Sequence, residues 1–194
     1  MKQESTVKYI LRLTVTLLAI CAVVALALAG VNAITKDKIA ENKAAKTQAA
    51  LQEVLPGVQE VQEISFTDTT GMVTKVYRAN MSLSSDSNIA FGYAVEVAPN
   101  GFGGAISMMV GVSAEGKVLG ISIISHAETP GLGAVASADT DKGTAFRDQF
   151  IGLINGISIG DGENQIDSLS GATISSQAIV DGVNAALACV AGLG

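Results

Sequence analysis

Hydrophobic and polar positions follow three different patterns along the chain. Leu13 to Ile34 is a run of 22 residues without a charge. Because a helix rises about 1.5 Å per residue, this run is long enough to cross the hydrocarbon core of a membrane. Lys36 to Leu55 is rich in Ala, Lys, Glu and Gln and stops at Pro56-Gly57, which predicts a helical stalk over 35–57. From residue 58 onward, short apolar runs alternate with turn residues and predict a folded domain over 58–194.

The apolar runs of this domain are typical of strands, because clusters of Gly, Asn, Pro or Ser bound them. Ser113 to Gly116 reads as the turn of a hairpin that joins the last two runs. Since the strands follow one another with little helix between them, a mainly antiparallel sheet is favoured. The expected strands are Val73–Tyr77, Ile89–Val97, Ala105–Val112 and Val118–Ile124.

Two segments of the domain have helical character. Gly143–Leu153 predicts a short helix centred on Phe146 and Phe150, and Ser175–Val190 predicts a longer one. The chain is therefore expected to be α+β, with one transmembrane helix, a helical stalk and one mostly antiparallel-sheet domain that ends in a helix. The apolar positions that share one face of the last helix are Ile179, Val183, Ala186, Leu187 and Val190.

Charge is unevenly distributed between the two ends of the chain. Residues 1–46 hold seven Lys or Arg and three Asp or Glu, whereas residues 47–194 hold five Lys or Arg and 15 Asp or Glu. An acidic domain argues against nucleic acid as a partner, because phosphates call for a basic face. Cys21, Cys189 and His126 are the whole complement of Cys and His, so no metal site of the usual kind is expected. We expect His126 to be a structural loop residue and Cys189 a small core residue.

The N-terminal apolar run has two interpretations. A cleaved signal peptide would use Lys2, Lys8 and Arg12 as its basic region and Ala27 to Ala29 as its cleavage site. We interpret the run as a retained transmembrane helix over 13–34 that contacts membrane lipid. Lysines also follow the helix closely, so the positive-inside count does not decide its orientation. An export-type N-terminal segment favours a domain outside the cytoplasmic membrane, with residues 1–12 in the cytoplasm.

The segment Asp167 to Thr173 lies directly before the last predicted helix. Unpaired N–H groups and the positive end of the helix dipole make such a position suitable for a phosphate. Gly171 and Ala172 let the backbone approach an anion closely, and Thr173 adds a hydroxyl. The alternative is ordinary turn chemistry, in which Thr173 or Ser175 is simply the N-cap of the helix.

A second distinctive segment runs from Glu128 through Thr129 to Gly133. Pro130 fixes its own φ and restricts the preceding residue, and Gly131 and Gly133 flank Leu132. This pattern predicts a tight exposed turn that presents one apolar side chain, suited to pressing against a planar ring. The alternative is a surface loop without a ligand.

The same glycines loosely fit a dinucleotide-binding fingerprint, Gly131-x-Gly133-x-x-Ala136. The fingerprint requires a helix to follow, and Ser137–Gly143 is polar and turn-like. We therefore reject a dinucleotide-binding fold.

Three segments of the chain resemble the covalent FMN-binding domain family. Asp167-x-x-Ser170-Gly171-Ala172-Thr173 resembles the flavinylation motif of that family, and His126 to Gly133 resembles its Glu-Thr-Pro-Gly-Leu-Gly signature. Gly101 to Gly104 is a looser match. The resemblance implies FMN bound through its phosphate to Thr173 by a flavin transferase that uses FAD. The cofactor-binding residues it implies are Asp167, Ser170, Gly171, Ala172 and Thr173, with Glu128, Thr129, Pro130, Gly131, Leu132 and Gly133.

Together with the N-terminal anchor, these segments are similar to the G subunits of Rnf-type complexes. The C subunits of the Na⁺-translocating NADH:quinone reductases are similar but typically longer. The resemblance implies an electron-transfer subunit of a membrane-bound ferredoxin:NAD⁺ oxidoreductase that couples redox to Na⁺ or H⁺ translocation, with its flavin domain on the outer face. It also implies partner subunits, among them a second FMN subunit and iron–sulfur subunits, and no complete active site in this chain alone. The alternatives are a stand-alone extracytoplasmic flavoprotein and an exported interaction module without redox function.

Overall fold

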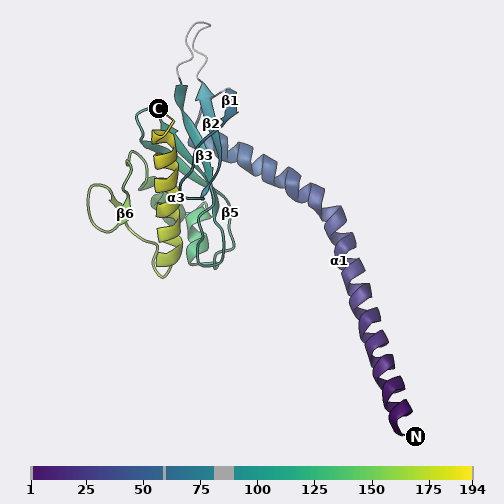
Figure 1. Cartoon of the computed structure of the whole chain (residues 1–194). Helices are drawn as coiled ribbons and strands as arrows, with labels where there is room; N and C mark the ends of the chain where they lie inside the picture. The colour runs from purple at the N-terminus through teal and green to yellow at the C-terminus, as the bar shows by residue number, and fades with distance from the viewer. Residues whose placement is uncertain (1, 59, 81–89, 194) are drawn as a thin grey trace. The chain divides into compact units, whose positions relative to one another are not determined.

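The computed structural model describes residues 2–58, 60–80 and 90–193, in two compact units, Met1–Ala45 and Lys46–Gly194. A single helix, α1 (Lys2–Val54), covers the expected membrane segment and continues through the expected stalk as far as Val54 (Figure 1). The last turns of α1 belong to the second unit, so the expected stalk over 35–57 ends inside the compact unit that holds the sheet.

All residues of the first unit that the structure describes belong to helix α1. Side chains from Val7 to Lys46 are all exposed, and this part of α1 is long and apolar enough to cross a membrane. The hydroxyls of Thr14 and Thr16 donate to the carbonyls of Ile10 (3.0 Å) and Arg12 (2.8 Å), so two polar groups of the uncharged run are satisfied within the helix. A long exposed apolar surface of this kind suits lipid rather than water.

Five strands form one antiparallel sheet in the order in which they occur along the chain. The hairpin turn is present between the fourth and fifth strands, where the N–H of Gly116 donates to the carbonyl of Ser113 at 3.0 Å. The expected mainly antiparallel sheet is thus confirmed. The strands are β1 (Glu60–Ile64), β2 (Val73–Asn80), β3 (Ala90–Val97), β4 (Ser107–Ser113) and β5 (Val118–Ser125).

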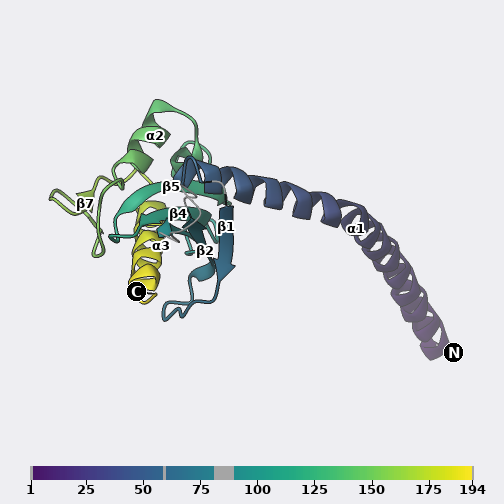
Figure 2. The same ribbon diagram turned by 90° about the horizontal axis from the view of Figure 1, so that it is seen from above.

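The two faces of the sheet are covered by different helices (Figure 2). Helix α3 (Thr173–Ala191) packs on one face, and all five apolar positions expected to face inward are buried. The last turns of α1 pack on the other face through Ala50 and Val54, together with Leu55 directly after the helix. A Cβ on Gly111 of β4 would lie 2.6 Å from the carbonyl oxygen of Val54, so a glycine is needed for this close approach.

Helix α3 is also long and apolar enough to cross a membrane, but about two thirds of its most apolar segment is buried inside the domain. It is therefore the core helix of this domain. Cys189 lies on its buried side, and burial together with the charge of Asp68 raises the pKa of its thiol. The expectation of a small core residue is met.

The structure corrects several boundaries. The strand expected over Ala105–Val112 begins at Ser107, and the one expected from Ile89 is described from Ala90, with Ile89 outside the described residues. The edge strand β1 was not expected, because polar residues dominate it. Two short parallel strands, β6 (Ser158–Ile159) and β7 (Gln165–Ile166), were also missed, since two residues carry no periodicity.

The short helix lies further toward the N-terminus than expected. Helix α2 spans Asp141–Asp148, so the segment expected to be turn-like up to Gly143 is partly helical. The hydroxyl of Thr140 caps α2 by accepting from the N–H of Gly143 at 3.3 Å. Phe146 and Phe150 are nevertheless both buried and pack edge to face, with ring centroids 5.6 Å apart.

Candidate functional site

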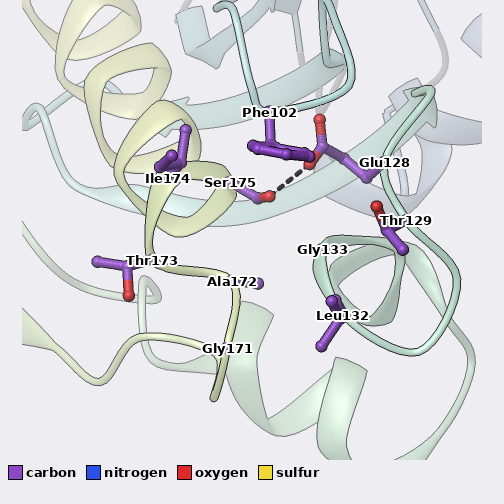
Figure 3. A pocket seen from close by; sticks show the side chains of 10 residues that line it. All are labelled: Phe102, Glu128, Thr129, Leu132, Gly133, Gly171, Ala172, Thr173, Ile174 and Ser175. Atoms are coloured by element: carbon purple, nitrogen blue, oxygen red, sulfur yellow. Dashed lines mark hydrogen bonds between the residues drawn. The ribbon is translucent and has the colours of Figure 1, made fainter.

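Three loops that are distant in sequence meet at one end of the domain and enclose a pocket of about 350 Å³ (Figure 3). They are the segment before β4, the segment after β5 and the start of α3. The structure therefore brings together the three segments that carry distinctive motifs. The residues that line the pocket are Phe102, Glu128, Thr129, Leu132, Gly133, Gly171, Ala172, Thr173, Ile174 and Ser175.

The segment after β5 forms the expected tight turn. The N–H of Leu132 donates to the carbonyl of Thr129 at 3.1 Å, and Gly131 has a φ of 77°. Proline in the second position and a left-handed glycine in the third define a type II turn. A 3₁₀ helix, η1 (Gly133–Ser137), follows directly. Pro130 and Gly131 shape the turn without lining the pocket, and Leu132 lines it while remaining 43% exposed.

The first turn of α3 has no side-chain cap. Ala172 occupies the N-cap position, and the first helical hydrogen bond runs from the N–H of Ser176 to the carbonyl of Ala172 at 2.9 Å. Neither Thr173 nor Ser175 is the N-cap, so the alternative of simple capping is wrong. The N–H groups of residues 173 to 175 precede that first bond, which leaves them available to an anion.

The hydroxyl of Thr173 is exposed, and within the described residues it has no hydrogen-bond partner. The loop in front of it is fixed by Ser176, whose hydroxyl donates to the carbonyl of Ala172 and accepts from the N–H of Leu169, both at 3.0 Å. Gly171 has a φ of 74°, which favours glycine at this position. Asp167 and Ser170 are exposed and lie outside the pocket lining.

Glu128 lines the pocket and is buried. Its carboxylate accepts hydrogen bonds from the N–H of Gly103 at 2.9 Å and from the hydroxyl of Ser175. Its own N–H donates to Nδ1 of His126 at 3.1 Å. Because Nδ1 accepts this bond, Nε2 is the N–H of the neutral ring and donates to Oγ of Ser137 at 2.7 Å. His126 is half-buried and structural, as expected.

Sequence reasoning missed Ser175, Ile174 and Phe102 as pocket residues. Phe102 and Ile174 are 70% and 58% exposed, although both are large and apolar. The sequence signal for Phe102 was its place between glycines, and for Ile174 its place directly after the Ser-Gly-Ala-Thr segment. Exposed apolar side chains beside a pocket are typical of a binding site.

The pocket fits a flat cofactor with an anionic tail. Apolar side chains of Phe102, Leu132 and Ile174 can cover a planar ring, and the free N–H groups at the start of α3 can hold a phosphate. Within the described part of the chain, no group of three His, Cys, Asp or Glu side chains is placed to hold a metal ion.

Comparison with known proteins identifies both parts of the chain. The family model for the FMN-binding domain matches residues 101–188, and the model for the RnfG N-terminal region matches residues 1–54. A relative from Acetobacterium woodii, the G subunit of a Na⁺-translocating ferredoxin:NAD⁺ oxidoreductase complex, is 32% identical over 91% of this chain and 89% of its own length. The chain belongs to the family of Rnf complex G subunits.

A second relative supports the same assignment, and a solved structure supports the fold. A Clostridium ljungdahlii relative, the G subunit of a proton-translocating ferredoxin:NAD⁺ oxidoreductase complex, is 40% identical over 52% of this chain and 54% of its own length. The crystal structure of the C subunit from the Na⁺-translocating NADH-quinone reductase of Parabacteroides distasonis covers 81% of this chain and 93% of its own, with a TM-score of 0.55 and 16% identity. That likeness shows the fold alone.

Membership of this family establishes the general role of the chain. It is an FMN-binding electron-transfer subunit of a multi-subunit, ion-translocating oxidoreductase complex, and it associates with the membrane. The expectation of an Rnf-type G subunit is confirmed.

Proposed function

We propose that this chain carries FMN joined through its phosphate to Thr173 and relays electrons within a ferredoxin:NAD⁺ oxidoreductase. One observation carries the proposal: the exposed, unbonded hydroxyl of Thr173 borders the pocket that Phe102, Leu132 and Ile174 line. A hydroxyl held in a cap or a core bond would be poorly available for a phosphoester. When bound, FMN supplies one-electron and two-electron redox chemistry.

The residues of the pocket divide the task of holding the cofactor. The N–H groups at the start of α3 and the helix dipole stabilise the negative phosphate. The left-handed conformation of Gly171 brings the backbone close to that phosphate. The phosphoester fixes only one end of the cofactor, so Leu132, Phe102 and Ile174 must orient the ring.

The location of the domain explains why a covalent link is useful. With residues 1–12 in the cytoplasm and 13–34 across the membrane, the flavin domain lies on the outer face, where a cofactor of modest affinity would be lost by dilution. A flavin transferase that uses FAD makes the link. Asp167 and Ser170, exposed outside the pocket, are available to that enzyme.

The ion path belongs to other subunits. One helix without an intramembrane charge offers no route for Na⁺ or H⁺, so partner membrane subunits supply it. A second FMN subunit and iron–sulfur subunits complete the electron path. The curated relatives include both Na⁺-translocating and proton-translocating complexes, so family membership leaves both coupling ions open.

Substitution of Thr173 tests the proposal directly. The full chain is produced together with a flavin transferase, and the peptide containing residue 173 is analysed by mass spectrometry. Thr173→Ala is expected to lose the flavin yet fold, because Thr173 makes no cap bond that could be lost. Thr173→Ser keeps a hydroxyl and is expected to retain part of the modification.

Thr129→Ala is the matched control, since Thr129 is also an exposed threonine of the pocket lining. It is expected to keep the flavin on residue 173. Covalent flavin in Thr173→Ala, or an unmodified Thr173 in the parent chain, would show that the attachment site is elsewhere or absent.

A further inference from the structure

The carboxylate of Glu128 is buried without a cation. It is only 6% exposed, and among the ion pairs of the described residues none involves it. A buried carboxylate is costly unless hydrogen bonds satisfy its oxygens. Oε1 accepts from the N–H of Gly103 at 2.9 Å, and Oε2 accepts from the hydroxyl of Ser175 (Figure 3).

These two bonds join all three loops of the pocket. Gly103 precedes β4, Glu128 follows β5 and Ser175 lies in the first turn of α3, 25 and 47 residues away from the glutamate. Ser175 is two residues after Thr173. The bond to Ser175 therefore fixes the start of α3 relative to the turn that presents Leu132.

Glycines allow the backbone to close around the carboxylate. A Cβ on Gly133 would lie 2.7 Å from Oε2 of Glu128, and one on Gly101 would collide with Oε1. A Cβ on Gly103 would run into the carbonyl of Ala127. The glycines of two motifs thus serve the packing of one side chain as well as the conformation of their loops.

From this geometry we propose that Glu128 is a positioning residue. Its carboxylate fastens the three loops together and so sets the orientation of a flavin ring attached at Thr173, and it acts through Gly103 and Ser175. The effect on the flavin rests on the proposed function. The fastening of the loops, by which we mean the hydrogen bonds of Glu128 to Gly103 and Ser175, is present in the protein without cofactor.

The fastening is tested first in the full chain without flavin, in a Thr173→Ala background. Hydrogen exchange of the Gly103 amide is measured by NMR in detergent. Glu128→Ala is expected to speed this exchange by about tenfold or more, because a hydrogen bond to a charged group is worth at least that factor. Glu128→Gln is expected to keep most of the protection, since its amide oxygen can accept from Gly103 and its NH₂ can donate to Ser175. An unchanged exchange rate of the Gly103 amide in Glu128→Ala would show that the carboxylate does not hold the three loops together.

The effect on the flavin is tested in the flavinylated full chain. Glu128→Ala is expected to keep the modified Thr173 peptide while flavin fluorescence anisotropy falls and the midpoint potential shifts, and Glu128→Gln is expected to restore both. Val112→Ala is the control for general destabilisation, because Val112 is fully buried near the far end of β4 from the pocket. It is expected to lower the melting temperature and leave anisotropy and potential unchanged.

Two results would overturn the proposal. One is an unchanged anisotropy and potential in Glu128→Ala, and the other is an equal change in Val112→Ala. If Glu128→Ala does not fold, Ser175→Ala removes one of the two bonds and is expected to shift the same readouts less. An unmodified Thr173 in the parent chain contradicts the proposed function alone, because the exchange of Gly103 still tests the fastening.

Discussion

Leu132 lies at the end of a type II turn whose backbone conformation presents it to the pocket. It also lies close to the loop before Thr173, since a Cβ built on Gly171 would lie 3.2 Å from its Cδ2. Its half-exposed state leaves apolar surface that a planar ring can cover. Burial of such a side chain is worth roughly 1.5–3 kcal/mol, enough to fix an orientation but small beside a covalent bond.

Leu132→Ala is therefore expected to change the flavin environment without removing the flavin. The amount of modified Thr173 stays near normal, while visible absorption, flavin fluorescence and midpoint potential shift and turnover of the complex falls. Ile154→Ala is the matched control, because Ile154 is a similarly exposed aliphatic residue outside the pocket. A normal spectrum and turnover in Leu132→Ala would mean that the turn is an ordinary surface loop.

At the level of single elements, α2 and α3 begin in different ways. Thr140 caps α2 with its hydroxyl, whereas α3 has Ala172 at its N-cap position and no side-chain cap. A missing cap costs about 1 kcal/mol of helix stability. In α3 extensive burial offsets this cost, and the N–H groups that a cap would occupy stay available to a phosphate.

Packing rather than helix propensity determines what α3 tolerates at Gly182. A Cβ there would lie 2.8 Å from Cγ of Pro99 and collide with Cε of Met108. Gly182→Ala gains about 1 kcal/mol in helix propensity. Overpacking costs about 1–3 kcal/mol, and the ring of Pro99 is rigid, so we expect a net loss of stability.

The melting temperature of the full chain in detergent measures this effect, and we expect Gly182→Ala to lower it by several degrees. Ala188→Gly, at an exposed position of the same helix, reports the propensity term alone. A higher melting temperature in Gly182→Ala would show that α3 can shift away from Pro99 without loss.

For the whole molecule, the uneven charge of the chain matches a membrane-anchored architecture. Most of the exposed large apolar side chains lie on α1, and the acids are concentrated in the domain that follows. The proposed topology places that domain outside. This topology agrees with the proposed covalent link to FMN and with the proposed electron exchange with partner subunits at the outer face.

Cysteine labelling tests this topology. Single cysteines are introduced by Ser5→Cys or Glu115→Cys in a chain whose own Cys21 and Cys189 are replaced, and intact cells stripped of outer layers are treated with a membrane-impermeant maleimide. Position 115, in the exposed hairpin turn, is expected to react at once, and position 5 only after lysis. The reverse pattern would place the domain in the cytoplasm.

The sequence alone determined the elements that depend only on interactions between residues close together in the chain. The uncharged run from Leu13 to Ile34 specifies a helix that is long and apolar enough to cross a membrane, and the apolar stripe from Ile179 to Val190 specifies the core helix by its period. The turn at Pro130-Gly131 follows from backbone restrictions within four residues. Residue type and spacing are sufficient in each case.

Only the tertiary structure decided how these elements combine into a pocket. The convergence of the loops at Gly103, Glu128 and Ser175 depends on contacts across 25 and 47 residues, which no local pattern encodes. The exposure of Phe102 and Ile174 was equally hidden, because apolar residues in a sequence are expected inside. Whether Thr173 caps its helix or presents a free hydroxyl also depended on the fold, since Ser176 and its bonds to Leu169 and Ala172 shape the loop. A capping threonine and one with a free hydroxyl have the same local sequence, and only the three-dimensional surroundings of the hydroxyl distinguish them.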